Sequence, residues 1–155
     1  MIWLIITVLF LAADQIVKYL VSAFLNVGET AFSVLNIFDV TYVQNKGAAF
    51  SVLAGRTELL SIVSVVFCVV IIVFWIKKKP SDTLLCLSLS LLFAGAAGNG
   101  IDRIFRGFVI DYINLKFMNF PVFNIADIGV TVGAALFILH TIFFEKEGKN
   151  GNNNS

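Results

Sequence analysis

Long apolar runs alternate with short polar connections along this chain of 155 residues. A helix needs roughly 20 apolar residues to cross a bilayer, and four segments meet that requirement, at about residues 2–24, 58–76, 83–101 and 125–144. The pattern predicts an α-helical integral membrane protein with four transmembrane helices in a single domain, residues 1–147. The small residues Ala94–Gly100 predict close helix packing in lipid. The Asn- and Gly-rich residues 148–155 predict a disordered tail.

The two longer connections, at about residues 25–57 and 102–124, have a different pattern. In Phe38–Val43 and Phe108–Phe117, apolar residues partly alternate with polar ones, and β-branched and aromatic residues are enriched, as is typical of strands. These segments predict a small β-sheet on one membrane face. Residues 47–53 follow a glycine turn and predict a short interfacial helix.

Three adjacent lysines, Lys77, Lys78 and Lys79, lie in the short connection between the second and third apolar segments. Short connections rich in Lys and Arg stay in the cytoplasm. We therefore expect both termini to be cytoplasmic and the sheet to be extracytoplasmic. The longer connections also carry basic residues, so the bias weakens when all connections are counted, but long connections follow the rule less strictly.

The first apolar segment has the position of a secretory signal peptide but not its composition. It has no basic residues at its start, and Asp14 and Lys18 stand where a cleavable segment is apolar or small. We therefore expect a helix of the mature protein. The two residues lie four apart on one helix face, which favours an intrahelical ion pair over catalysis.

The composition excludes an ordinary soluble domain. Hydrophobic residues make up 59% of the chain and charged residues 14%, and the mean hydropathy is +0.93. A formal net charge of +1 gives no reason to expect nucleic acid as a partner. Cys68 and Cys86 lack metal-ligand spacing and the acidic residues are scattered, so we expect no metal site and no cofactor.

Two aspartates lie close together along the chain: Asp111 is in the connection between the third and fourth apolar segments, and Asp127 is just inside the fourth. A carboxylate at the edge of a membrane is costly and indicates a functional site by default. Two neighbouring carboxylates tend to share one proton, so that one accepts a proton from water while the other donates to a scissile peptide bond. The pair predicts peptide hydrolysis without a metal, provided that folding brings the two side chains together.

Each of these residues also has a structural interpretation. Asp127 follows Asn124 by three residues at a predicted helix start, a spacing typical of a cap and a first-turn carboxylate. Asp111 lies among apolar residues of a predicted strand, where a buried partner would explain it. Asp102 and Arg103, at the outer end of the third segment, fit an interfacial ion pair. The sequence leaves these alternatives open.

Other functions find less support. His140 falls thirteen residues after Asp127, about 20 Å along a helix, too far to act as a base near the aspartates. A transporter or channel would use Asp14, Lys18 and the aspartate pair as a relay, but the inner halves of the later helices are nearly devoid of ionisable residues. A noncatalytic assembly factor would explain the apolar surface but not the paired aspartates.

Five short motifs, in order along the chain, resemble those of the bacterial lipoprotein signal peptidases (signal peptidase II), aspartic endopeptidases with four membrane helices. They are Asp14-Gln15-x-x-Lys18, Asn45-Lys46-Gly47-Ala48-Ala49-Phe50, Gly98-Asn99-Gly100-Ile101-Asp102-Arg103, Val109-Ile110-Asp111 and Phe123-Asn124-Ile125-Ala126-Asp127. One motif alone is weakly specific, but five in register are highly specific. Gly100 departs from the family, which usually has Leu there, and we expect it to loosen the end of the third helix without affecting the chemistry.

The resemblance implies a role for each motif residue. Asp111 and Asp127 would be the catalytic dyad, and residues that contact substrate or orient the dyad would be Asn45, Asn99, Arg103 and Asn124. Structural support would come from Asp14, Lys18, Gly47 and Asp102. The implied substrate is a prolipoprotein with a diacylglyceryl group on a cysteine, cleaved just before that cysteine. We expect a monomer in contact with lipid in the bacterial cytoplasmic (inner) membrane, with its active site near the extracytoplasmic face.

Overall fold

The computed structural model describes residues 1–47 and 55–143. Its four long helices are α1 (Ile2–Phe24), α2 (Thr57–Lys78), α3 (Thr83–Arg106) and α4 (Ile125–Phe143), and each is long and apolar enough to cross a membrane. The prediction of a four-helix membrane protein is confirmed. The predicted short helix at residues 47–53 and the predicted tail fall on segments almost wholly outside the described residues.

α3 continues five residues beyond its predicted end at residue 101 and stops at Arg106, where Gly107 caps the helix with a left-handed φ of 78°. The prediction placed Asp102 and Arg103 in the outer connection because charged residues ordinarily mark the end of a membrane span. In the structure Asp102 is 0% exposed, because a lysine from α1 neutralises it inside the bundle. The expected loosening at Gly100 is also wrong, since the helix runs on through this residue.

α3 is the central helix of the bundle. In the apolar 18-residue window of α3, 61% of residues are buried, against 17% or less in the corresponding windows of the other three helices, which all pack on α3. Glycines allow the close approach: a Cβ at Gly95 would meet the backbone oxygen of Ala126 in α4, and a Cβ at Gly98 would lie 2.6 Å from Asp14 in α1. The predicted packing role of the small residues is therefore confirmed.

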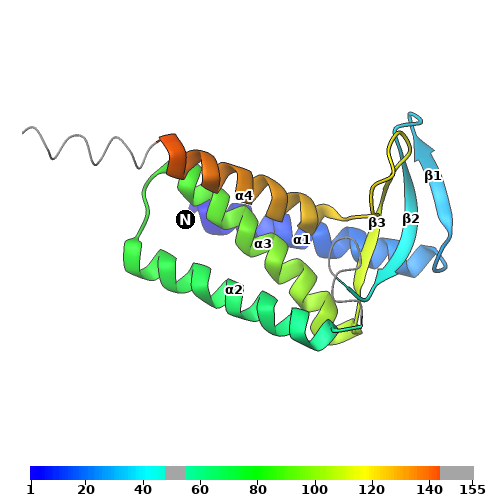
Figure 1. The fold of residues 1–155 in the computed structure, drawn as a ribbon, viewed down its shortest axis with the longest axis horizontal. Helices are drawn as coiled ribbons and strands as arrows, with labels where there is room; N and C mark the ends of the chain where they lie inside the picture. The colour runs from blue at the N-terminus through cyan, green and yellow to red at the C-terminus, as the bar shows by residue number, and fades with distance from the viewer. Residues whose placement is uncertain (48–54, 144–155) are drawn as a thin grey trace, which may run out of the picture.

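A three-stranded antiparallel sheet lies at one end of the bundle, opposite the connection between α2 and α3 (Figure 1). Its strands are β1 (Thr30–Val34), β2 (Phe38–Asn45) and β3 (Val109–Leu115), in the order β1-β2-β3. The sheet and two of its strands were predicted, but β1 was not. All but one of its five residues are exposed, so it lacks the alternation of apolar and polar residues that identifies a half-buried strand.

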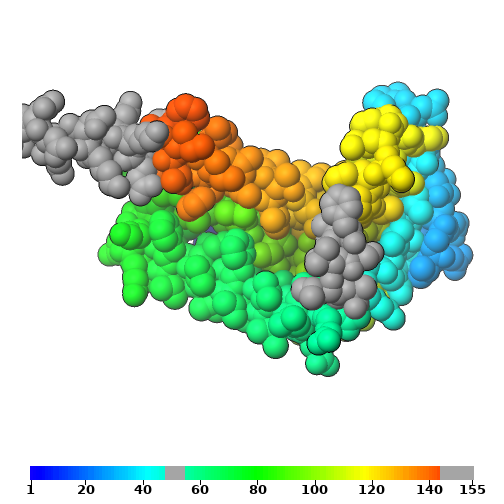
Figure 2. Space-filling model, in the orientation of Figure 1, coloured from blue at the N-terminus to red at the C-terminus, as the bar shows by residue number. Residues whose placement is uncertain are grey.

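The sheet is anchored to the helices by a small apolar cluster. Tyr42 of β2 and Ile110 and Tyr112 of β3 pack with Val21, near the end of α1. In the bundle itself, α2 packs on α3 and makes little contact with α1 or α4. A hollow therefore runs between α2 and α4, with α3 at its bottom (Figure 2).

The packing of α4 on α3 makes Gly133 a sensitive position. A Cβ there would lie 2.9 Å from both Ser88 O and Leu92 N, backbone atoms that have little room to move. We predict that Gly133→Leu destabilises the fold by about 1–3 kcal/mol, the usual cost of overpacking.

The measurement is thermal unfolding in detergent. Ala135→Leu is the matched control, because Ala135 is exposed on the same helix and a larger side chain there faces lipid. Equal unfolding temperatures for the two variants would contradict the close α3–α4 contact.

Candidate active site

Asp111 and Asp127 come from different elements but line the same cavity. Asp111 is the third residue of β3, 1% exposed and opposite Val43 of β2. Asp127 lies in the first turn of α4. The cavity has a volume of about 770 Å³ and is walled by α2, α3, α4 and β3. The fold thus brings the two aspartates to one site.

Asn124 connects the two aspartates. Its Nδ2 donates to Asp111 Oδ1 at 2.7 Å, and its Oδ1 accepts the backbone N–H of Asp127 at 2.9 Å. In return, the backbone N–H of Asn124 donates to Asp127 Oδ2 at 3.1 Å. These reciprocal bonds are those of a helix cap. The capping interpretation of Asp127 and its place in the cavity are therefore compatible, because the cap itself points the carboxylate at the site.

Asn45, the last residue of β2, presents a donor to the other oxygen of Asp111. Its Oδ1 accepts the backbone N–H of Gly47 at 2.8 Å, and its Nδ2 donates to Asp111 Oδ2 at 2.9 Å. A backbone N–H can only donate. Gly47 therefore fixes which end of the Asn45 amide faces the aspartate.

Asn99 of α3 is oriented toward Asp127 in the same way. Its Oδ1 accepts from Lys18 Nζ at 2.9 Å, and its Nδ2 donates to Asp127 Oδ1 at 2.7 Å. An ammonium group has donors and no acceptor, so Lys18 determines the orientation of the amide. Each carboxylate thus receives amide hydrogen bonds, and each amide is held from behind by a donor.

Lys18 also forms the centre of a buried ionic cluster. Its Nζ lies 2.9 Å from Asp14 Oδ2, as predicted for the helical pair, and 3.0 Å from Asp102 Oδ2 of α3. Neither the lysine nor the two carboxylates are exposed. Asp14 also accepts the backbone N–H of Ala126 at 2.9 Å, so the paired side chains of Asp14 and Lys18 on α1 connect α4 and α3.

The predicted interfacial pair between Asp102 and Arg103 is wrong. Asp102 pairs with Lys18 and with Arg106, whose Nε lies 3.3 Å from Asp102 Oδ1. Arg103 instead lines the cavity and donates from Nη2 to Gly47 O at 3.2 Å. Consecutive residues of a helix do not face one another. Asp102 therefore points into the bundle while Arg103 points into the site.

The environment of Asp111 favours its protonated form. Burial, followed by the negative charge of Asp127, raises the pKa of Asp111 to about 7, although hydrogen bonds from Asn45 and Asn124 act in the opposite direction. A carboxyl group with a pKa near 7 is suited to exchange protons at neutral pH.

The cavity opens toward the membrane as well as toward the sheet. Its walls include Val63 and Phe67 of α2 and Ile128 and Val132 of α4, which are all exposed on the lipid-facing surface of the bundle. Most of the polar side chains in the lining lie at the end near the aspartates, and Ser64 and Thr131 lie further along the walls. A ligand with an apolar portion and a polar centre fits this distribution.

The remaining chemical groups lie elsewhere. His140 is near the other end of α4, where its Nε2 lies 3.4 Å from Asp82 Oδ1. It therefore does not reach Asp111 or Asp127. Within residues 1–47 and 55–143, no three His, Cys, Asp or Glu side chains are grouped so that they could hold a metal ion.

Comparison with known proteins identifies the family. The family model described as signal peptidase (SPase) II matches residues 6–143. The chain belongs to the signal peptidase II family. The lipoprotein signal peptidase of Enterococcus faecalis is 37% identical over 98% of this chain and 96% of the relative. That of Halothermothrix orenii is 40% identical over 93% of this chain and 97% of the relative.

Solved structures of bacterial membrane enzymes share this fold. One bacterial membrane enzyme, determined by the in meso method, superposes with a TM-score of 0.86 at 30% identity and covers 99% of this chain and 91% of that one. A second gives a TM-score of 0.83 at 31% identity, covering 92% of this chain and 93% of that one. The similarity extends over the helices and the sheet together.

In this signal peptidase II chain, sequence reasoning missed Tyr112. Its hydroxyl accepts the backbone N–H of Ile125 at 3.3 Å, and so satisfies one of the free donors at the start of α4, next to the candidate site. Its position beside Asp111 gave only a weak signal, because successive side chains along a strand point to opposite faces. Gly100 was noticed as a departure from the family, and its packing explains it: a Cβ there would lie 3.1 Å from Ser64 Cβ of α2.

We predict that Asp14→Ala lowers folded yield and stability more than it changes the chemistry of the enzyme that survives. The substitution removes one of the two carboxylates paired with Lys18 and leaves the N–H of Ala126 without its partner. Breaking a buried ion pair costs about 3–5 kcal/mol. Yield, thermal unfolding and turnover per folded molecule are measured together.

Glu58→Ala is the control, since Glu58 is exposed in the first turn of α2. A normal yield and unfolding temperature combined with lost turnover would instead make Asp14 a functional residue.

Proposed function

We propose that this chain is an aspartic endopeptidase in which Asp111 and Asp127 form the catalytic dyad. The observation that carries the proposal is that both carboxylates line one cavity and are connected through the single side chain of Asn124. Two carboxylates held in this way, in a partly apolar site, are suited to share one proton and activate water.

In the proposed reaction, Asp111 holds the proton and Asp127 is ionised. Burial favours a neutral Asp111, whose pKa is raised to about 7. Asp127 lies in the first turn of α4, where the helix dipole and the backbone N–H of Asn124 favour a negative charge. Asp127 takes a proton from the attacking water while Asp111 donates its proton to the carbonyl oxygen. When the C–N bond breaks, Asp127 passes the proton taken from water to the leaving nitrogen, and the hydroxyl of the tetrahedral intermediate returns its proton to Asp111 as the carbonyl re-forms.

The three asparagines hold the dyad without adding charge to it. Their Nδ2 groups donate to Asp111 at 2.9 Å and 2.7 Å and to Asp127 at 2.7 Å. Each amide is a neutral donor, so it stabilises the negative charge of the pair. A cationic partner in a salt bridge would instead favour ionisation of both carboxyl groups and loss of the shared proton. We assign Asn45, Asn99 and Asn124 to positioning the dyad, and Arg103, on the cavity wall, to contacting substrate.

The proposed substrate is a prolipoprotein that carries a diacylglyceryl group on a cysteine. The relatives are named for action on lipoproteins. An apolar cavity open between α2 and α4 supports this choice, because acyl chains could enter sideways from the bilayer while the peptide reaches the aspartates. Cleavage just before the modified cysteine would release the signal peptide and leave the lipid anchor in the membrane.

The proposed orientation places the dyad at the extracytoplasmic face of the bacterial cytoplasmic membrane. The lysines of the α2–α3 connection, the start of α1 and the described end of α4 lie at the end of the bundle away from the sheet (Figure 1). Because short lysine-rich connections remain in the cytoplasm, the sheet and the dyad face outward. We also propose that the enzyme acts as a monomer, since one chain supplies every wall of the cavity.

We predict that Asp111→Asn and Asp127→Asn each reduce cleavage by roughly 10²–10⁴-fold, because an amide keeps the shape of the carboxyl group but cannot transfer its proton. The assay is cleavage of a diacylglyceryl-modified prolipoprotein in liposomes. Asp39→Asn is the control, because Asp39 lies on β2 of the same sheet and pairs with Lys116. An active Asp111→Asn enzyme would overturn the dyad.

The pH dependence gives a second prediction. If Asp111 is the acid, kcat/KM falls as the pH rises through about 7, where Asp111 loses its proton. The hydrogen bond from Asn45 lowers the pKa of Asp111, so its removal in Asn45→Ala raises that pKa and moves the alkaline limb to higher pH.

The pH profile of kcat/KM is compared with that of Gln44→Ala, whose side chain bonds to Tyr42 and not to the dyad. An alkaline limb that stays in place or moves to lower pH in Asn45→Ala would contradict the assignment of Asp111 as the acid.

A further inference from the structure

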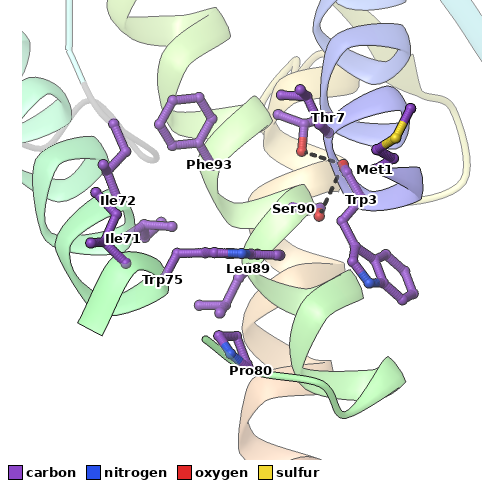
Figure 3. Close-up of a pocket in the computed structure, with 12 residues that line it drawn as sticks. Met1, Trp3, Thr7, Ile71, Ile72, Trp75, Pro80, Leu89, Ser90 and Phe93 are labelled. Carbon is purple, nitrogen blue, oxygen red and sulfur yellow. Dashed lines mark hydrogen bonds between the residues drawn. The ribbon is translucent and has the colours of Figure 1, made fainter. Parts of the chain in front are cut away.

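A second cavity lies between α1, α2 and α3, toward the end of the bundle away from the dyad (Figure 3). Its volume is about 490 Å³, and no residue that lines it also lines the dyad cavity. It exists because α1 and α2 pack on α3 but make little contact with one another. Figure 3 shows Trp75 reaching from α2 toward Leu89 of α3, with Pro80 beside them.

The side chains that line this α1–α2–α3 cleft are mostly apolar, and both of its side-chain hydroxyl groups already donate within the bundle. Thr7 Oγ1 already donates to Trp3 O at 2.9 Å, and Ser90 Oγ donates to Cys86 O at 2.8 Å. The other lining side chains are apolar, apart from the indole N–H of the tryptophans. Leu4, Ile72 and Ile76, on the rim, are 44–68% exposed on the surface that faces lipid. A hydrocarbon chain from the surrounding bilayer therefore fits the cleft.

Positive charge is concentrated at one end of the cleft. Ile76 and Pro80 line it, and Lys77, Lys78 and Lys79 occupy the positions between them, all three exposed. The acidic residue of this connection, Asp82, is engaged elsewhere: its Oδ1 accepts the N–H of Leu85 and faces His140. The described part of the chain contains no ion pair to these lysines.

Two tryptophans mark the same end. Trp3 and Trp75 both line the cleft, and tryptophan is enriched at the level of lipid headgroups. An apolar slot that ends beside tryptophans and three lysines is complementary to a lipid with a hydrocarbon chain and a negatively charged headgroup.

We propose that the α1–α2–α3 cleft binds one acyl chain of an anionic phospholipid, whose phosphate is held by Lys77, Lys78 and Lys79. The occupant is a bilayer lipid and not the substrate, because the site lies away from the dyad and shares none of its walls. The proposal does not depend on the aspartic mechanism.

The chain provides its own reporter for this lipid, because its only two tryptophans both line the cleft. Trp3→Phe leaves Trp75 as the sole tryptophan, whose fluorescence is excited selectively over that of the three tyrosines. The full chain is reconstituted in mixed vesicles of phosphatidylglycerol and phosphatidylcholine, with bromine on the acyl chains of one lipid at a time. Bromine quenches indole fluorescence on contact. We expect brominated phosphatidylglycerol to quench Trp75 with an apparent affinity at least about threefold higher than that of brominated phosphatidylcholine.

Two variants separate the headgroup from the chain. In Trp3→Phe, replacing all three lysines, Lys77→Gln, Lys78→Gln and Lys79→Gln, should abolish the preference while brominated phosphatidylcholine still quenches. Filling the cleft with Thr7→Leu and Ile72→Phe should reduce quenching by both lipids. Lys116→Gln, which removes a lysine from β-sheet contacts at the other end of the molecule, is the control and should leave the preference unchanged.

Competition distinguishes a lipid headgroup from free phosphate. Inorganic phosphate at millimolar concentration should not reverse the quenching if the acyl chain supplies the affinity, whereas non-brominated phosphatidylglycerol should. Equal quenching by the two brominated lipids would overturn the proposal, and so would a preference that survives loss of the three lysines. Quenching that filling the cleft leaves unchanged would also overturn it, because Trp75 would then be sensing only the lipid around the bundle.

Discussion

The ammonium group of Lys18 lies within 3.0 Å of carboxylates on two helices, Asp14 and Asp102, and none of the three groups is exposed. An unpaired charge buried inside the bundle would cost several kcal/mol. α1 and α3 can therefore bury these residues only when they pack so that Lys18 lies beside Asp102. The same ammonium group binds Asn99 and determines which atom of its amide faces Asp127. The buried ammonium group of Lys18 therefore affects both the packing of α1 on α3 and the orientation of the Asn99 amide beside Asp127.

The candidate dyad is held from three elements by one repeated arrangement. In Asn45, Asn99 and Asn124, the amide oxygen is occupied by a group that can only donate, and the amide nitrogen faces an aspartate. A lysine or arginine at these positions would bind a carboxylate more strongly, but would lock it in the charged form. Amide donors are weaker, which is compatible with a pKa for Asp111 of about 7 and with the sharing of a proton between two carboxyl groups.

Both cavities result from the way α2 packs in the bundle. Because α2 packs on α3 and makes little contact with α1 or α4, the bundle is open on both sides of α2. On one side, the opening leads to the aspartates; on the other, it ends beside three lysines. In a soluble protein such openings would expose apolar surface to water, whereas in a bilayer they are filled by hydrocarbon at little cost. The open side of the dyad cavity suits a lipid-modified substrate, and the lack of ionisable groups deeper in its walls does not suit an ion relay.

The sequence alone determined the four membrane spans, two of the three strands and which residues are candidates for the site, because hydrophobic length and the membrane cost of a carboxylate are local properties. It could not determine that Asp102 pairs with Lys18 and not with Arg103, that α3 extends to Arg106, or that β1 exists. Those outcomes depend on what another element brings close. The same holds for the meeting of Asp111 and Asp127 in one cavity. The sequence gives the two residue types, but the packing of β3, α3 and α4 around Asn124 brings their side chains to one site.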